Sequence, residues 1–489
     1  MLSLVLILDF FLKKELEESI GDRLSASSVE YDEIAVSFFK SSSTVTQTKW
    51  EIGEYSIQAD KILVNDLSYI DYLFNKKIVI GEIVISNPEV IFNKNDSVQE
   101  SSIKNKNLHL EKEIVVKKFI VNGGCLILKN KETVSNKLYF SIKDLNFYEI
   151  LINSKTLEGT LPFVYNGVEI ESDSIFYELD EAQNITLKNL KLKDRNLAVK
   201  DFRIIPKYEK AEFDRRISVE KDRFELDLNS FKINGLDWEV KNDSLYLLAL
   251  VTHISGADFK VYRNKLLPDD ISIKPLYSQV IRELGAKIKF DSIYIESSQM
   301  EYEEKSADSR PPGKVGFYNV RAEMVNISNI GMKLNDFPKT KIHLETRFMN
   351  EANLMLNWEF DVRNIEDDFK VSGNLKSISA QAMNSFLTPA INLEVEGEIE
   401  STYFNFQGNK YKANGDMRLK YNNFRVEVLK KDGNGKNKFL TGIANLLVKK
   451  EANSKKLEIK GVEAVRDRTK SFWNFLWLLI RNGALKSFL

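Results

Sequence analysis

The sequence predicts a mainly β protein, a long and predominantly antiparallel sheet with few short helices. Three observations support this prediction. The chain contains 30 Phe and 18 Tyr, and aromatic and β-branched side chains suit the pleated, half-buried surface of a sheet. Apolar residues alternate with polar ones through most of the chain, which is the period of a strand. Helical spacing is confined to a few short segments.

Length and composition indicate a folded chain. At 489 residues it is too long for one ordinary compact core, so we expect two or three domains or one elongated repetitive body. Its 43% hydrophobic and 29% charged residues lie outside the disordered range. Because 70 basic residues nearly balance 71 acidic ones, no global field favours a nucleic-acid partner. The single cysteine, Cys125, excludes an intramolecular disulfide.

Four stretches share one pattern, in which an apolar alternation crosses two turn-forming residues and then resumes. The pattern predicts two antiparallel strands that share one apolar face, joined by a tight turn. The crossings are Asn87-Pro88, Gly123-Gly124, Gly235-Leu236 and Ser297-Ser298. The apolar positions around the first, second and fourth crossings are Ile83, Ile85, Val90, Phe92, Phe119, Val121, Leu126, Leu128, Ile293, Ile295, Met300 and Tyr302, and those around the third are Phe231, Ile233, Trp238 and Val240.

Similar alternation fills much of the remaining chain. At roughly ten to twelve residues per strand and turn, it would give on the order of thirty strands, far more than one sandwich holds. The alternative is two or three separate sandwiches. No Pro, Gly and Ser-rich linker marks a boundary between them, although Arg310-Pro311-Pro312 is a local break.

Three short helices are expected to interrupt the strands. Ser68 is expected to cap a helix over residues 69–74. An apolar stripe predicts a second helix over residues 275–285. A third, over residues 379–387, is expected to stop before Pro389. We expect all three to pack on the sheet or to plug it.

The N-terminal residues 1–12 are almost wholly apolar. Twelve residues give only about 18 Å of helix against about 30 Å of hydrocarbon, and no basic region precedes them. We interpret them as the tail of a membrane anchor whose first residues are missing from the sequence; the alternative is an ordinary buried helix. The expected membrane contacts are Leu4, Leu6, Leu8, Phe10 and Phe11.

A second apolar helix is expected near the C-terminus, over residues 472–480, with basic residues on both sides. It is too short to span a bilayer, but two Trp and the basic flanks suit the headgroup region of an anionic membrane. The alternative is a helix that plugs the open end of the sheet. The expected membrane contacts are Phe472, Trp473, Phe475, Leu476, Trp477, Leu479 and Ile480.

The sequence offers no support for an enzyme, a metal site or a cofactor. His109, His253 and His343 lie far apart, and none has a second ligand at metal spacing. Cys125 occupies an apolar position, which favours an inert thiol over a nucleophile. Gly433-Asn434-Gly435-Lys436 lacks the upstream Gly and the following hydroxyl of a phosphate-binding loop. We therefore expect a non-enzymatic protein, with a hydrolase on a β scaffold as an open alternative.

The run from Ser68 to Phe92 resembles a unit of the AsmA-like family of bacterial envelope proteins, relatives of bridge-like lipid-transfer proteins. In that family a short helix precedes a strand of alternating Ile or Val with an internal Gly, then Pro and a second strand; the matching residues are 69–74, 79–85 with Gly81, Pro88 and 90–92. The C-terminal third is similar, with a helix around 382–387, then Pro389, Gly397, Gly415, Met417, Tyr421 and the strand 424–429. The shortened N-terminal apolar segment departs from the family's pattern.

This resemblance implies a twisted, trough-like sheet with an apolar inner face, lying in the periplasm, anchored to the inner membrane and directed toward the outer membrane. It also implies a role in phospholipid traffic and outer-membrane integrity. The apolar face of a single curved sheet must be covered, and in a trough acyl chains can cover it, at about 0.8 kcal/mol per buried methylene. The predicted partners are therefore phospholipids or other acyl-chain lipids, and a membrane at one or both ends.

The candidate lining of this groove is the twelve-residue set around the first, second and fourth crossings; the alternative is that these side chains simply pack on each other. The expected organisation is an anchor at 1–20, groove repeats at 21–265, a helical insertion at 266–285, a C-terminal groove at 286–465 and a final helix at 466–489. A second hypothesis is a periplasmic scaffold that binds an outer-membrane assembly partner, or another envelope protein, through exposed sheet edges.

Overall fold

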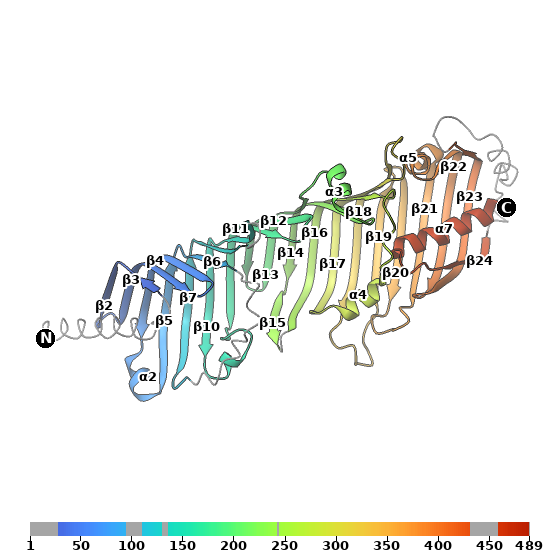
Figure 1. Cartoon of the computed structure of the whole chain (residues 1–489). Coiled ribbons are helices and arrows are strands. Elements are labelled where there is room, and N and C mark those ends of the chain that lie inside the picture. Colours follow the sequence, from blue (N-terminus) through green and yellow to red (C-terminus); the bar gives the residue numbers. More distant parts are fainter. Residues whose placement is uncertain (1–27, 94–109, 130–134, 242–243, 431–457, 489) are drawn as a thin grey trace. The chain divides into compact units, whose positions relative to one another are not determined.

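The computed structural model describes residues 28–93, 110–129, 135–241, 244–430 and 458–488 (Figure 1). The prediction of a mainly β protein is confirmed, with 62% strand and 13% helix. The chain divides into two compact units: the first contains residues 1–202 and 238–245, and the second contains residues 203–237 and 246–489. This division falls earlier in the chain than the expected boundary at residue 265.

The first unit is built mostly of antiparallel strand pairs. Its strands are β1 (Ser28–Glu30), β2 (Glu33–Ser37), β3 (Ser42–Ile52), β4 (Tyr55–Leu67), β5 (Lys77–Ser86), β6 (Glu89–Asn93), β7 (Glu113–Asn122), β8 (Cys125–Lys129), β9 (Asn136–Ser141), β10 (Asp144–Ile152), β11 (Gly167–Glu178) and β12 (Gln183–Lys193). Strands β13 (Asn196–Pro206) and β15 (Asp237–Lys241) cross the boundaries between the units. The helical segments of the first unit are α2 (Tyr69–Phe74) and the 3₁₀ turn η1 (Thr156–Glu158).

The second unit has longer strands and four described helices. Its strands are β14 (Asp222–Asn234), β16 (Ser244–Asn264, of which residues 244–245 belong to the first unit), β17 (Lys287–Lys305), β18 (Gly313–Ser328), β19 (Thr340–Phe348), β20 (Ala352–Phe360), β21 (Phe369–Ser379), β22 (Leu393–Gly408), β23 (Lys412–Val428) and β24 (Glu458–Val465). Its helices are α3 (Lys210–Arg216), α4 (Tyr277–Glu283), α5 (Ala380–Ile391) and α7 (Phe472–Phe488). From β17 to β24, each strand pairs antiparallel with the next one along the chain.

Three of the four predicted hairpins are wrong, because the chain keeps its direction across the crossing. Strand β4 pairs antiparallel with both β5 and β6, so these two strands follow one another along the same partner. Likewise, β7 pairs with β10 while β8 pairs with β9, and Ser297-Ser298 lies inside the single strand β17. The third predicted hairpin, at Gly235-Leu236, lies where the two units divide, and it remains a prediction.

Left-handed backbone conformation explains this error. The crossings contain Asn87, Gly123, Gly124 and Ser297 at φ of 47°, 73°, 97° and 51°. A left-handed residue inside a strand interrupts the ladder and bends it. A side chain at Gly124 would also collide with the Pro88 carbonyl oxygen, 2.2 Å from the position of its Cβ. A tight turn and a bend of this kind both use Gly, Asn or Ser for two residues, so the sequence pattern predicts either.

The bends lie at matching positions on neighbouring strands, and together they form two creases across each sheet. The ladder pairing is skipped at these positions, for example between β4 and β5 and between β16 and β17. The left-handed residues of the first unit's creases are Gln47, Asn87, Gly123, Gly124 and Asn189 on one line and Asp66 and Glu149 on the other; in the second unit they are Gly256, Ser297 and Asn319 on one line and Asn326 on the other.

The strand pairing is mixed, with antiparallel pairs in the majority, as the sequence predicted. Strand β5 pairs in parallel with β7, β6 with β8, and β16 with β17. Parallel neighbours need a crossover connection. The connection from β16 to β17 carries α4.

Helix α2 spans the predicted residues, whereas α4 is two residues shorter than predicted at each end and α5 is longer than predicted. Ser68 caps α2, and its side-chain oxygen accepts a hydrogen bond from the Asp71 backbone nitrogen at 3.3 Å. Helix α5 does not stop before Pro389 but continues to Ile391. Proline in the last turn removes only one backbone bond, and Asn392, at φ 57°, ends the helix.

Candidate functional site: the apolar faces of the sheets

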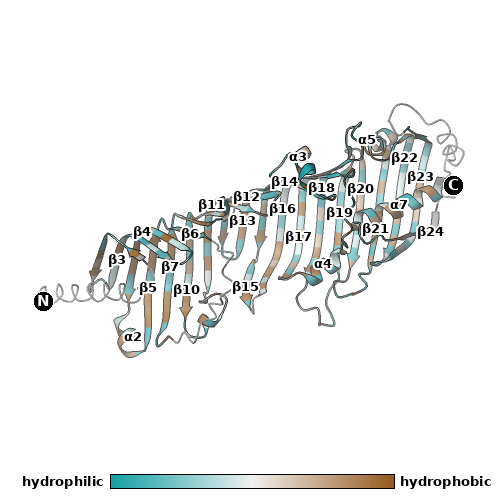
Figure 2. Ribbon diagram, in the orientation of Figure 1, coloured by the Kyte–Doolittle hydropathy of each residue, from teal (hydrophilic) through white to brown (hydrophobic). Residues whose placement is uncertain are grey.

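In the first unit, the apolar residues of neighbouring strands stand in register and form continuous rows. Eight predicted groove residues fall on four such rows. The rows are Val45, Ile62, Ile85, Val121, Leu145, Ile170 and Leu192; Val64, Ile83, Phe119, Phe147 and Val168; Trp50, Ile57, Val90, Leu126, Phe140, Ile175 and Leu187; and Tyr55, Phe92, Leu128, Leu138, Tyr177 and Ile185. Figure 2 shows β5 and β7 among the most apolar strands of this unit.

Most side chains on these rows are only half-buried. Of the eight predicted residues, Val121 is buried and the other seven are intermediate between buried and exposed. The two helical segments described in this unit, α2 and η1, contain no buried residue. Aromatic rings from the loop before β11 cover one place, where Phe163 and Tyr165 pack against Phe147 at centroid distances of 5.9 and 5.1 Å. The rows therefore keep apolar surface in reach of a ligand.

The rows are long enough for acyl chains. The first row crosses seven strands, β3, β4, β5, β7, β10, β11 and β12. At about 4.8 Å between strands, six steps give a length of about 29 Å. This length is close to the hydrocarbon thickness of a bilayer, about 30 Å, which two acyl chains fill end to end.

In the second unit, the four remaining predicted residues share one face. Cross-strand pairs through β18 and β19 connect Ile295 to Leu356 on β20. In the same way, cross-strand pairs connect Met300 to Ala352 on β20. Leu356 and Ala352 lie on the same strand, β20, whose pairing runs without a skipped position. Residues at even spacing on such a strand point to one side. The same alternation places Ile293 and Tyr302 beside Ile295 and Met300, on that side.

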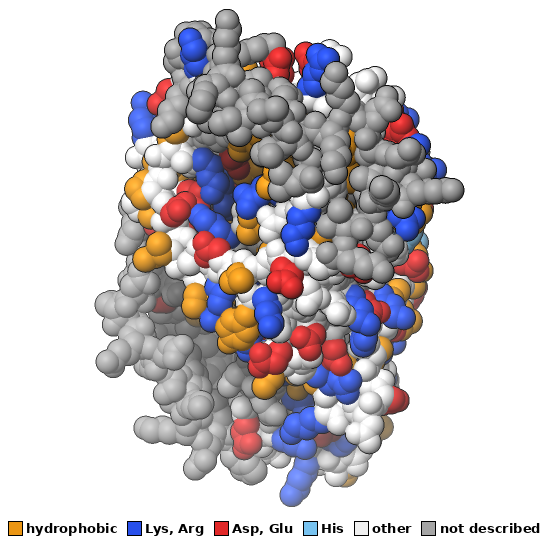
Figure 3. Space-filling view, turned by 90° about the vertical axis from the view of Figure 1, so that its right-hand side faces the viewer, with side chains coloured by type: hydrophobic (Ala, Val, Ile, Leu, Met, Phe, Trp, Pro, Cys, Tyr) orange, Lys and Arg blue, Asp and Glu red, His pale blue; other side chains and the backbone are white. Residues whose placement is uncertain are grey.

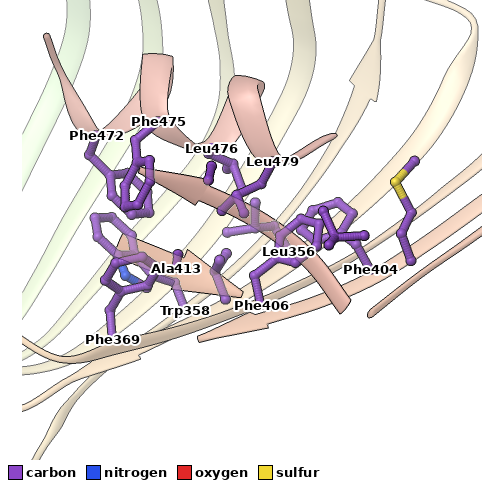
Figure 4. Close-up of a cluster of buried hydrophobic side chains, with 14 of the residues drawn as sticks. Leu356, Trp358, Phe369, Phe404, Phe406, Ala413, Phe472, Phe475, Leu476 and Leu479 are labelled. Atoms are coloured by element: carbon purple, nitrogen blue, oxygen red, sulfur yellow. The ribbon is translucent and has the colours of Figure 1, made fainter. Parts of the chain in front are cut away.

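Helix α7 covers part of this face (Figure 4). The helix buries one stripe against the sheet, formed by Phe472, Phe475, Leu476 and Leu479, at 3%, 1%, 6% and 0% exposure. Trp358 of β20 stacks on Phe472 with ring centroids 4.4 Å apart. The buried cluster extends to Ile342 and Leu344 on β19. Ile293 and Ile295 lie two strands further along the same rows and are half-buried.

Ion pairs hold the segment that leads into α7. The carboxylate of Glu220, 2% exposed, accepts hydrogen bonds from Lys265 and from Lys470, the latter at 2.9 Å. Lys470 also pairs with Asp269 at 2.7 Å. Burial acts to raise the pKa of Glu220, but the hydrogen bonds from the two lysines outweigh it and hold the pKa below its ordinary value. The Glu220 carboxylate is therefore charged at neutral pH, which keeps α7 fixed at its first turn.

Polar side chains close one end of the apolar face in the second unit. Arg263 donates two hydrogen bonds to Asp222, at 2.6 and 2.7 Å. The Tyr302 hydroxyl donates to Glu304 at 2.7 Å. Burial and then the Glu304 carboxylate raise the pKa of Tyr302 far above its ordinary value. These groups satisfy one another and leave the rows beside them apolar.

The predicted membrane contacts have different outcomes at the two ends. Leu4, Leu6, Leu8, Phe10 and Phe11 lie outside the described residues. At the C-terminal end, the buried stripe of α7 packs on a face of the sheet, whereas the alternative prediction placed this helix at the open end of the sheet. Of the remaining three predicted residues, Trp473 and Trp477 are 49% and 41% exposed and Ile480 is half-buried. Among the described helices, none combines the length and the apolar character needed to cross a bilayer.

The residues considered for chemistry remain separate. Cys125 is half-buried, and burial, followed by the Glu89 carboxylate, raises the pKa of its thiol, which disfavours the reactive thiolate. His253 stacks on Tyr294 at 5.3 Å, and His343 contacts Asn357 at 2.7 Å. His109 and the segment 433–436 lie outside the described residues. Within the described ranges, no three His, Cys, Asp or Glu side chains form a metal-binding group.

Charge is evenly mixed where the second unit is seen from its C-terminal side. Figure 3 shows basic, acidic and apolar side chains interspersed on the described part of this face. A surface of this kind produces no strong field of one sign. Long-range electrostatic steering therefore gives no indication of a partner here.

The sequence did not indicate the partners of the predicted residues on each row. Val64, Phe147 and Ile170 belong to the same rows as Ile83 and Ile85, although no local pattern connects them. The α4 contact was also missed: the Trp473 indole donates to the Tyr277 hydroxyl at 3.0 Å, across 196 residues. The row partners depend on the register between strands and the α4 contact on how the helices pack, and neither can be inferred from a single sequence.

Comparisons with known proteins identify no relative. No family model and no curated protein matches the chain. Among solved structures, that of Pseudomonas aeruginosa OccK8 (OprE) is similar over 79% of this chain and 89% of that chain, at 8% sequence identity and a TM-score of 0.11. A likeness this weak carries no argument about fold or function.

Proposed function

We propose that the protein holds or conducts acyl-chain lipids along the apolar faces of its sheets, by partition and without chemistry. One observation supports this most: apolar side chains stand in register across many strands and stay half-buried, as on the row of Ile83 and Phe119. Half-covered apolar surface is unfavourable in water, at about 25 cal/mol per Å². An acyl chain laid along a row would bury it, and each methylene would contribute about 0.8 kcal/mol.

Rows of aliphatic and aromatic side chains favour tails over headgroups. Phe119 and Ile83, for example, offer no hydrogen bond to a phosphate or an amine. The proposed ligands are therefore phospholipids or other acyl-chain lipids, with little selection among headgroups. We further propose that the four rows of the first unit face one side, as the corresponding rows of the second unit do through β20.

The biological setting comes from the resemblance to AsmA-like proteins and remains a proposal. On that basis the protein would be anchored in the inner membrane, with a periplasmic body, and would support phospholipid transfer to the outer membrane and outer-membrane integrity. A protein that only holds lipid needs no active site. The alternative is a scaffold for outer-membrane assembly, which would use sheet edges such as the short strands β1 and β2.

Mass spectrometry of the protein purified without added lipid tests this function. We expect acyl-chain lipids to co-purify at one or more molecules per chain, because the rows leave apolar surface open. The species should vary with the lipids of the host, since the tails and not the headgroups are enclosed. A stably folded, lipid-free monomer that binds a protein partner saturably in cross-linking would contradict the proposal and favour the scaffold.

A further inference from the structure

The connection between β4 and β5 carries an unusual amount of exposed apolar surface. It contains the six-residue helix α2, in which Ile70, Leu73 and Phe74 are 70%, 69% and 78% exposed. Tyr72 is 46% exposed, and the helix has no buried residue. Single exposed apolar residues are common, but a run of them on one short helix indicates a site of interaction.

A neighbouring turn adds to this surface. Phe39, in the turn between β2 and β3, is 67% exposed. The turn lies beside the start of α2, because the rings of Phe38 and Tyr69 stack with centroids 4.9 Å apart. The Leu67 nitrogen also donates to the Ser41 carbonyl at 3.2 Å. We call the exposed residues Phe39, Ile70, Tyr72, Leu73 and Phe74 the apolar tip.

The apolar tip is held in place by polar contacts at its base. Asp71 accepts hydrogen bonds from Ser68 at 2.5 Å and from the Asn75 amide at 2.7 Å. These two bonds lower the pKa of Asp71, so its charge is stabilised inside the capping contacts. The Lys112 ammonium lies 3.3 Å from the Tyr72 ring centroid and donates to the Tyr72 carbonyl at 3.1 Å. The exposed side chains are thus presented by a fixed helix.

Lysines lie beside the apolar tip. Lys40 follows Phe39 in sequence, and Lys112 lies over the Tyr72 ring. Lys77 is paired with Glu113 at 2.9 Å, and Asp71 is occupied in the cap. Lys76 is exposed beside Phe74. Exposed apolar side chains with neighbouring lysines are typical of segments that enter the headgroup region of anionic bilayers.

We propose that the apolar tip docks the first unit on the surface of an anionic bilayer, with Leu73 and Phe74 inserted at the boundary of headgroups and acyl chains. A protein partner fits less well, because a stable protein interface buries about 800 Å² per side and a six-residue helix offers much less. Insertion needs only a few apolar side chains. The proposal goes beyond lipid holding and stands whether or not acyl chains occupy the rows.

A fluorescent label on the apolar tip tests this docking directly. Since Cys125 is the sole cysteine, the full chain with Cys125→Ser and Leu73→Cys carries one labelling site. With an environment-sensitive dye at this site, we expect a blue shift and at least a twofold gain in emission on vesicles of phosphatidylcholine and phosphatidylglycerol. The control label is at Ile271→Cys, an exposed position of the second unit, where no change is expected. Unchanged emission at residue 73, with or without vesicle binding, would overturn the proposal.

Vesicle co-sedimentation gives a second, independent result. Leu73→Ser combined with Phe74→Ser should weaken binding to the same vesicles at least tenfold, and Lys76→Glu should weaken it only when phosphatidylglycerol is present. Ile271→Ser combined with Ile365→Ser, both exposed in the second unit, is the matched control and should leave binding unchanged. Equal effects of the two double variants, or none, would overturn the docking. Lipid co-purification is measured separately, so failure of the docking leaves the proposed function open.

Discussion

Replacing Phe119 by aspartate is expected to abolish most lipid binding by the first unit. Phe119 lies between Ile83 and Phe147 on its row and contacts the Phe147 ring at 6.4 Å. A carboxylate there cannot be buried under an acyl chain without a large desolvation cost. The chain would lose contact over about three methylenes, or about 2.5 kcal/mol, which corresponds to roughly a fiftyfold to hundredfold loss of affinity.

A matched variant separates the face of the sheet from the charge itself. Asn146 lies next to Phe147 on β10 and pairs with Ile120, so its side chain points to the other face of the sheet. Asn146→Asp adds the same charge on that face and should leave the bound lipid unchanged. The measurement is the number of lipids per chain by native mass spectrometry, with thermal unfolding as the check on folding. Equal lipid content in the two folded variants would contradict the role of the row.

The second large effect is expected on stability. Phe406→Ala should destabilise the second unit by about 3 to 5 kcal/mol, because it leaves a cavity in a closely packed core. Phe406 is 0% exposed, stacks on Phe404 at 5.1 Å and belongs to the cluster under α7. Tyr403, on the same strand and 46% exposed, provides the control. Tyr403→Ala should change the free energy of unfolding by about 0.5 kcal/mol or less.

Chemical denaturation with one probe in each unit measures this effect. The prediction is an earlier transition of the second unit with no shift of the first. A small effect of Phe406→Ala, comparable to that of Tyr403→Ala, would mean that α7 does not close a packed core over β20 to β23. Helix α7, which covers the buried cluster in Figure 4, would then be only loosely attached to the sheet.

Composition and alternation were sufficient to predict the class of fold and eight of the positions that form the rows of the first unit. The pattern around Asn87-Pro88 and that around Gly123-Gly124 repeat at an offset of 36 residues. The structure pairs the same residues in parallel, Ile83 with Phe119 and Val90 with Leu126. The repeat thus identified true neighbours, although it was interpreted as two separate hairpins.

The direction of the chain at the crossings could not be predicted from one sequence. Gly124 and Ser297 suit a tight turn and a bent strand equally well, since both need left-handed backbone. The choice depends on which strands lie alongside, and these come from distant parts of the chain. The same limit applies to α7, because Phe472 and Phe475 gain their burial from β20 and β21, about a hundred residues earlier.

The central claim is that the apolar rows of the first unit contact acyl chains. Photo-cross-linking tests it most directly, with a benzophenone amino acid placed at Ile85 or at its neighbour Val84 in the cell-produced protein. Ile85 lies on a row, and Val84 points to the other face of the same strand. The account predicts lipid adducts at position 85 and few or none at position 84. Equal adducts at both positions, or protein adducts alone at position 85, would contradict it.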